Sequence, residues 1–192
     1  MMIDRQKDTM QRMGKASQVA RVGLLFLIAC CLFVLGVCFV VYPNRYNQMI
    51  ATQSQQRGLE PNLVKAVIWT ESKYRADAES KKGAKGLMQI LPSTAKWLMQ
   101  IDHLPETHLD LSDPQTNIAL GTRYLQYLHT KFEDTNTVLA AYNAGEGKVR
   151  LWLRDPQCSH DGKRLHKIPY QETKNYVQRV QKAQTMYRRL YG

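Results

Sequence analysis

The chain has 192 residues, of which 44% are apolar and 22% charged, and its formal net charge is +11. This composition excludes a wholly disordered chain and one embedded throughout in a membrane. The length suits one compact domain with a short appendage. A disulfide framework is also excluded, because Cys30, Cys31 and Cys38 lie in one apolar run and only Cys158 lies outside it.

The first element is an uncharged apolar run from Val22 to Tyr42. About 20 residues span a bilayer core as a helix, so we expect a transmembrane signal anchor over residues 22–42 after a cytoplasmic tail over residues 1–21. Five basic residues precede the run, whereas only Arg45 and Arg57 follow it closely. The positive-inside rule therefore predicts a single-pass membrane protein whose remainder is extracellular or periplasmic.

Two alternatives compete with an uncleaved anchor. A cleaved signal peptide usually has a shorter apolar core, and no A-x-A-like site ends this run. Leu27 to Cys30 resembles a bacterial lipobox, which would make the chain a lipoprotein at Cys30. Strong hydrophobicity continues for about a dozen residues beyond Cys30, so the length of the segment favours the anchor.

The exported part carries most of the charge, since residues 43–192 sum to +8 and residues 1–42 to +3. A basic exported domain would be attracted to anionic surfaces such as wall polymers or lipid headgroups. A generic solvated basic face is an equally open interpretation. Nucleic acid is not expected as a partner, because no recognition motif for it is present.

Helical signals dominate the exported part, and no segment shows clear strand alternation. We expect a juxtamembrane segment over residues 43–59 and an all-α globular domain over residues 60–192. Residues 83–91 are the best candidate for a short extended or irregular segment. The predicted helices begin at Pro61, at Pro92, at Asp113-Pro114, after Asn136 as a cap, around Val149 and at Pro169.

Glu71 is the unusual residue of the first of these helices. It shares a face with Val64, Val67 and Ile68 at helical spacing, so packing of that face would partly desolvate its carboxyl group. Desolvation raises the pKa of a carboxyl group and suits it to protonate a glycosidic oxygen. From this feature alone, an ordinary exposed glutamate near a helix end is the more common explanation.

Four ordered motifs change that assessment. They are Glu71-Ser72, the G-L-M-Q segment 86–89, the A-Y-N-A-G segment 141–145 and the stretch from Ile168 to Val177. Their order and spacing resemble the soluble-type (SLT) catalytic domain of lytic transglycosylases, in the goose-type lysozyme-like superfamily. The resemblance covers about residues 45–192.

This resemblance implies a lysozyme-like helical fold with a groove for peptidoglycan glycan strands. It implies that Glu71 is the single general acid and then general base for cleavage of the β-1,4 bond between N-acetylmuramic acid and N-acetylglucosamine. Glycosidases usually use two carboxyl groups. In this family the N-acetyl group of the substrate attacks the anomeric carbon, and the muramoyl 6-hydroxyl displaces it to give a 1,6-anhydro end.

The resemblance also implies five substrate-binding residues. Ser80 would hold the acetamido group, Gln89 would line the groove, and Tyr142 would orient the Glu71 carboxyl or stabilise developing charge. Asn143 would bind sugar or cap local backbone, and Glu172 would lie in the groove. Alternatives stay open from the residues alone: a turn for Ser80, a core position for Tyr142 and a helix-dipole role for Glu172.

No metal and no cofactor are expected, and we expect a monomer. Cys158, His160 and His166 cluster in sequence, but their spacing fits no zinc pattern. Two other functions remain open. One is a goose-type lysozyme-like hydrolase, in which water finishes the reaction, and the other is a non-catalytic wall-binding scaffold.

Overall fold

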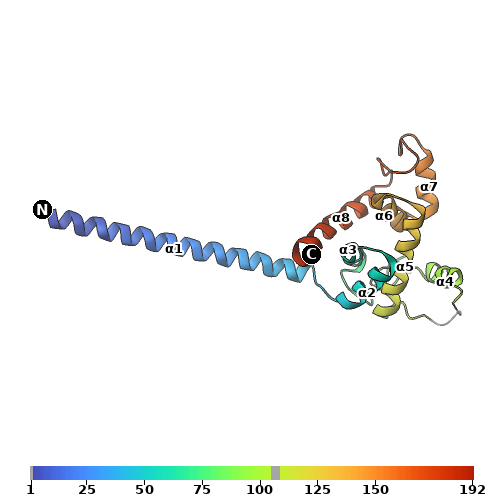
Figure 1. Cartoon of the computed structure of the whole chain (residues 1–192), viewed down its shortest axis with the longest axis horizontal. Helices are drawn as coiled ribbons and strands as arrows, with labels where there is room; N and C mark the ends of the chain where they lie inside the picture. The colour runs from blue at the N-terminus through green and yellow to red at the C-terminus, as the bar shows by residue number, and fades with distance from the viewer. Residues whose placement is uncertain (1, 105–108) are drawn as a thin grey trace. The chain divides into compact units, whose positions relative to one another are not determined.

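The computed structural model describes residues 2–104 and 109–192, with the side chains of residues 2–20 and 22 outside the described set. Of the charged side chains in the expected cytoplasmic tail, only that of Arg21 is therefore described, and it is exposed. The chain divides into two compact units, Met1–Pro43 and Asn44–Gly192 (Figure 1).

The first unit is a single helix, α1, over Met2–Val41. Its segment Gly23–Val41 has a mean hydropathy of 3.2, and large apolar side chains such as Leu24, Phe33 and Val40 are exposed along it. Among the described residues, α1 is the one helix long and apolar enough to cross a membrane. A signal anchor and a signal peptide share this property.

The second unit is all-helical, as expected from the sequence. The described residues contain no β-strand, and the segment 79–90 forms two isolated bridges, Glu79 with Lys85 and Lys85 with Ile90. The helices are α2 (Asn47–Arg57), α3 (Pro61–Ser72), α4 (Pro92–Ile101), α5 (Pro114–Lys131), α6 (Thr135–Ala144), α7 (Glu146–Arg154) and α8 (Gln171–Tyr191).

The core forms around α3, whose most extensive helix–helix contact is with α8. The predicted apolar face of α3 is confirmed, because Val64, Val67 and Ile68 are fully buried. The compact unit begins at Asn44 rather than near residue 60, because α2 packs against both α5 and α3. Ile50 of α2 is fully buried, so the expected juxtamembrane segment contributes to the core.

Three prolines occupy the first helical position as predicted, namely Pro61, Pro92 and Pro114. The start of α6 differs from the prediction. Asp134 caps this helix instead of Asn136, because its carboxylate accepts a hydrogen bond from the backbone N–H of Thr137 at 2.9 Å. The last helix begins at Gln171, two residues after the proline that was expected to open it.

Candidate active site

An open cleft with a volume of about 330 Å³ lies over the end of α3. The cleft brings together all six residues that the sequence singled out, although they come from four different segments. Its lining residues are Glu71, Ser80, Lys81, Lys82, Ala84, Gln89, Leu91, Tyr142, Asn143 and Glu172.

Glu71 is the penultimate residue of α3, on the face that packs into the core. Its side chain keeps partial access to the cleft, while protein atoms surround its carboxyl group. Burial raises the pKa of Glu71 to about 7, against the weaker opposing effects of Tyr176 and Arg179. A carboxyl group with this pKa holds a proton at neutral pH for a large fraction of the time, as a general acid requires.

Tyr176 of α8 is a neighbour of this carboxyl group that the sequence analysis did not single out. Its hydroxyl stabilises the charged form of Glu71, although their contact falls short of full hydrogen-bond geometry. The pKa of Tyr176 is raised well above its usual value, first by burial and then by the Glu71 charge. A buried tyrosine hydroxyl usually has a polar partner, so a tyrosine at a core position of the last helix was the sequence feature that could have indicated a polar neighbour such as Glu71.

Tyr142 of α6 lies close enough to Glu71 for the two side chains to interact electrostatically, but its hydroxyl proton is donated elsewhere. The hydroxyl donates a hydrogen bond to the backbone carbonyl of Met88 at 2.8 Å. A phenol has one proton to donate, so Tyr142 does not donate to Glu71 in this arrangement. This hydrogen bond connects the G-L-M-Q segment to α6. The Tyr142 ring contacts the Tyr124 ring at a centroid distance of 5.2 Å.

Gln89 has its amide nitrogen engaged by the protein itself. This nitrogen donates to the backbone carbonyls of Ala78 and Gly86, both at 3.0 Å. The two N–H groups are thereby used, which leaves the side-chain oxygen as the group available to a ligand. The bonds also hold Gln89 in a left-handed backbone conformation with φ of 49°.

Asn117 of α5, which the sequence analysis did not identify, holds the irregular segment 83–91 by hydrogen bonds to its backbone. Its side-chain oxygen accepts from the N–H of Met88 at 2.7 Å, and its nitrogen donates to the carbonyls of Lys85 and Leu111 at 2.9 and 2.8 Å. Asn117 is fully buried beside Gly86. A polar residue next to the apolar stripe of α5 was the only sign of this role.

The other predicted residues, Ser80, Asn143 and Glu172, each have a polar group that remains available to a ligand in the cleft. The Ser80 hydroxyl accepts from the N–H of Ala84 at 3.0 Å, which leaves its own proton to donate. The Asn143 side-chain oxygen accepts from the hydroxyl of Thr173 at 2.8 Å, which leaves its amide N–H groups. Glu172 is exposed in the first turn of α8.

Two carboxylates close to Glu71 in sequence do not line the cleft. Asp77 and Glu79 are exposed, and Glu79 pairs with Lys85 at 3.7 Å. Within the described ranges, no group of three His, Cys, Asp or Glu residues is placed to hold a metal ion. In the polar loop after α7, His160 and His166 stack with ring centroids 3.6 Å apart.

These features define a class of protein: an all-helical domain with one desolvated carboxyl group at the base of an open polar cleft. Residues 48–164 match the family described as Transglycosylase SLT domain. The match covers more than half of the chain, and the chain therefore belongs to this family.

Curated relatives agree with this membership. The chain is 34% identical over 155 residues to soluble lytic murein transglycosylase of Escherichia coli strain K12, which covers 79% of this chain and 24% of the relative. It is 28% identical over 170 residues to membrane-bound lytic murein transglycosylase C of Actinobacillus succinogenes, covering 77% of this chain and 48% of that protein. The chain thus spans only about a quarter to a half of these relatives.

Solved structures agree as well. The 70-kDa soluble lytic transglycosylase of Escherichia coli superposes with a TM-score of 0.72 at 32% identity, covering 81% of this chain and 26% of that one. An inactive mutant of lytic transglycosylase from Pseudomonas aeruginosa, with glutamate replaced by glutamine, superposes with a TM-score of 0.68 at 32% identity. It covers 79% of this chain and 25% of that protein. The predicted fold class is confirmed.

Proposed function

We propose that this chain is a peptidoglycan lytic transglycosylase that uses Glu71 as its only catalytic carboxyl group. The observation that carries the proposal is the desolvated Glu71 carboxyl, with its pKa raised to about 7, in a cleft with Ser80 and Gln89. The named activity of the relatives and the inactive glutamate-to-glutamine mutant support the same assignment.

In the proposed reaction Glu71 first donates a proton and then accepts one. Protonated Glu71 donates to the bridging oxygen, while the N-acetyl oxygen of the muramoyl residue attacks its anomeric carbon and the glycosidic bond breaks. The Glu71 carboxylate then takes the proton of the muramoyl 6-hydroxyl, whose oxygen displaces the N-acetyl group. The products are a free sugar hydroxyl and a 1,6-anhydro end, the acid regains its proton, and no water is consumed.

The cleft offers separate groups for these steps. The free Ser80 proton is available to hold the acetamido group in position for attack, and the Gln89 side-chain oxygen is available to accept from a sugar hydroxyl. Burial raises the pKa of Glu71 to about 7, so the protonated form that can donate to the glycosidic oxygen is well populated at neutral pH.

Mass spectrometry of the digestion products tests the activity. The purified full chain in detergent is expected to release anhydromuramoyl products from isolated peptidoglycan. Reducing muramoyl ends would instead establish the lysozyme-like hydrolase, and the absence of any cleavage would favour the wall-binding scaffold.

A pair of variants tests the assignment of the acid. Glu71→Gln removes the proton donor and is expected to abolish cleavage. Glu79→Gln removes an exposed carboxylate that pairs with Lys85 outside the cleft, and it is expected to retain cleavage. Retained activity in Glu71→Gln would contradict the assignment.

We also infer that α1 is an uncleaved anchor that keeps the domain at the outer face of the membrane. The length and hydropathy of Gly23–Val41 support this inference. The intact mass of the protein purified from membranes distinguishes the three possibilities: a full-length chain is expected, a shortened one indicates a cleaved signal peptide, and a lipid-modified N-terminal Cys30 indicates a lipoprotein.

A further inference from the structure

Two lysines line the cleft in positions that the reaction does not use. Lys81 and Lys82 lie in the turn that Ser80 closes with Ala84, and both side chains are exposed. Neither belongs to an ion pair in the described part of the chain, whereas nearby Lys85 pairs with Glu79. The wall of the cleft formed by this turn therefore presents two uncompensated positive charges.

Two further basic residues, Lys73 and Arg179, lie near Glu71 but do not line the cleft. Arg179 of α8 acts electrostatically on both Glu71 and Lys73. Burial and Arg179 together lower the pKa of Lys73 to about 8, and the Lys73 ammonium lies over the Trp69 ring. Neither Lys73 nor Arg179 has an acidic partner within ion-pair distance among the described residues. Like charges held close together favour the binding of an anion.

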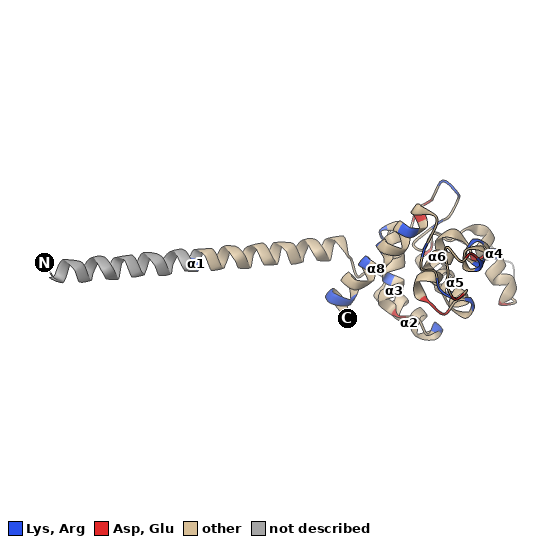
Figure 2. Cartoon of the chain, turned by 90° about the horizontal axis from the view of Figure 1, so that it is seen from above, with Lys and Arg blue, Asp and Glu red and all other residues tan. Residues whose placement is uncertain are grey.

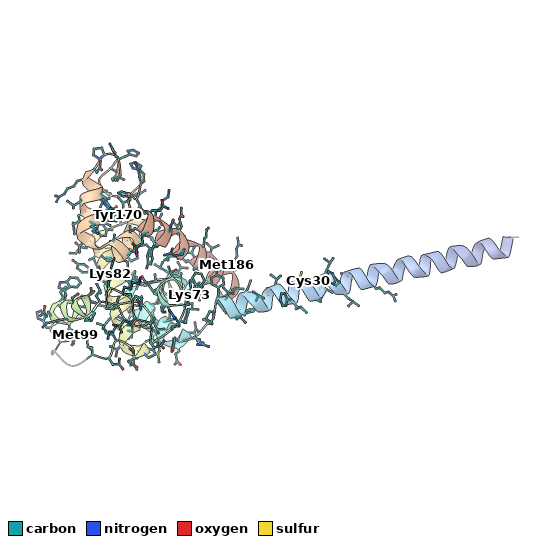
Figure 3. The ribbon with its side chains drawn as sticks, turned by 180° about the vertical axis from the view of Figure 1, so that it is seen from behind. Cys30, Lys73, Lys82, Met99, Tyr170 and Met186 are labelled. Carbon is teal, nitrogen blue, oxygen red and sulfur yellow. The ribbon has the colours of Figure 1, made fainter. Side chains whose placement is uncertain are left out.

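The carboxyl groups of the cleft do not neutralise this arrangement. Apart from Glu71, which is protonated when it donates, Glu172 on α8 is the one acidic residue among the described residues that line the cleft. Basic residues continue along α8, as the blue segments of Figure 2 show. In the view of Figure 3, Lys82 lies between Tyr170 and Met99, and Lys73 lies nearer to Met186.

We propose that Lys81 and Lys82 bind carboxylates that the glycan strand carries on its muramoyl lactyl groups. The lysines would thereby select muramoyl strands over neutral polymers of N-acetylglucosamine. The carboxylate has two sources: the lactyl group itself where the peptide has been removed, and the stem peptide where it is present. This inference rests on the proposed function for its substrate, but it concerns binding rather than bond cleavage.

Binding by the full chain in detergent tests the proposal, with Glu71→Gln present in every variant to prevent turnover. The ligands are soluble peptide-bearing strands, the same strands after amidase treatment, and a neutral N-acetylglucosamine oligomer of matched length. Lys81→Ala/Lys82→Ala is compared with Lys163→Ala/Lys167→Ala, which removes two exposed charges that do not line the cleft.

The Lys81→Ala/Lys82→Ala variant is expected to bind carboxylate-bearing strands about tenfold more weakly, with the neutral oligomer unchanged. The same loss should appear in the parent protein on raising the salt concentration. Lys81→Arg/Lys82→Arg should restore affinity, and circular dichroism establishes that each variant is folded. A loss confined to peptide-bearing strands assigns the carboxylate to the stem peptide, and a loss on both strand types assigns it to the muramoyl position in general.

Two outcomes would overturn the proposal: unchanged affinity for all three ligands, or an equal loss that includes the neutral oligomer. A failure of the proposed function is distinguishable from these outcomes. It would appear as the absence of anhydro products from the parent chain with Glu71 intact, whatever the binding measurements give.

Discussion

The side-chain oxygen of Asn117 accepts a hydrogen bond from the backbone N–H of Met88 at 2.7 Å, which joins α5 to the irregular segment that carries Gln89. The Asn117 nitrogen donates to two carbonyls on either side, those of Lys85 and Leu111. One fully buried amide thus binds three backbone groups of segments that belong to no helix or sheet, and of these the Lys85 carbonyl also accepts from the Ile90 N–H at 3.0 Å. The position of Gln89, one residue further on, depends on this connection.

Asn117→Ala is expected to destabilise the domain by about 3 kcal/mol or more, because it leaves buried backbone groups without partners. Urea unfolding followed by tryptophan fluorescence reports on this unit, which contains all three tryptophans of the chain. Asn136→Ala is the control, since it removes a partly exposed contact with Gln181 and should cost less than about 1 kcal/mol. Equal losses in the two variants would contradict the anchoring role of Asn117.

Gly86 and Gly83 form a matched pair for testing how tightly the segment is packed. The φ angle is +78° at Gly86 and +77° at Gly83, so alanine would be strained by about 1 kcal/mol at either position. A Cβ at Gly86 would also lie 2.2 Å from Asn117 Nδ2 and from the Leu111 carbonyl oxygen, whereas a Cβ at Gly83 meets nothing within 4 Å. Gly86→Ala should therefore lower the thermal midpoint far more than Gly83→Ala and reduce cleavage activity. Similar midpoints would show that the segment can move aside.

Helical signals in the sequence were sufficient to predict α3 to α8, because most of these helices bury apolar residues on one face. The apolar positions Val64, Val67 and Ile68 of α3 are fully buried as predicted. The prolines and their fixed φ also located three helix starts correctly. The packing of α2 against the core was not predicted, because the helix is mostly polar and only its Ile50 and Ser54 are buried.

The composition of the site was predictable, but the hydrogen bonds within it were not. The motif resemblance identified six residues that the structure brings into one cleft. The partners of Tyr142 and Gln89 are backbone carbonyls of an irregular segment, and no residue pattern specifies those contacts. Tyr176 has the spacing of a core residue, so its proximity to Glu71 appears only when α8 is packed against α3.

Tyr176→Phe is expected to shift the pH dependence of cleavage. The Tyr176 hydroxyl lowers the pKa of Glu71, so its removal should raise that pKa further. The alkaline limb of kcat/KM, which reports the acid of the free enzyme, should then move to higher pH. Tyr127→Phe is the control, because the Tyr127 hydroxyl donates to Glu146 and not to the acid. A limb that moves to lower pH would contradict this electrostatic role of Tyr176.

Glu71→Gln should stabilise the folded domain, and the effect should depend on pH. Burial raises the folded-state pKa of Glu71 from 4.5 to about 7, so between these values the unfolded chain releases a proton that the folded chain keeps. Stability in the parent protein therefore falls as pH rises through this window, by up to about 3 kcal/mol for this group. Glutamine does not ionise and avoids the loss.

The measurement is the difference in free energy of unfolding between Glu71→Gln and the parent protein, at pH 5 and at pH 8. It should be small at pH 5 and grow to about 2–3 kcal/mol in favour of the variant at pH 8. Glu79→Gln, which removes an exposed carboxylate paired with Lys85, should change stability by less than about 1 kcal/mol at both pH values. A difference that shrinks from pH 5 to pH 8 would mean that the folded state favours the charged carboxylate. Glu71 would then be unsuited to deliver a proton at neutral pH.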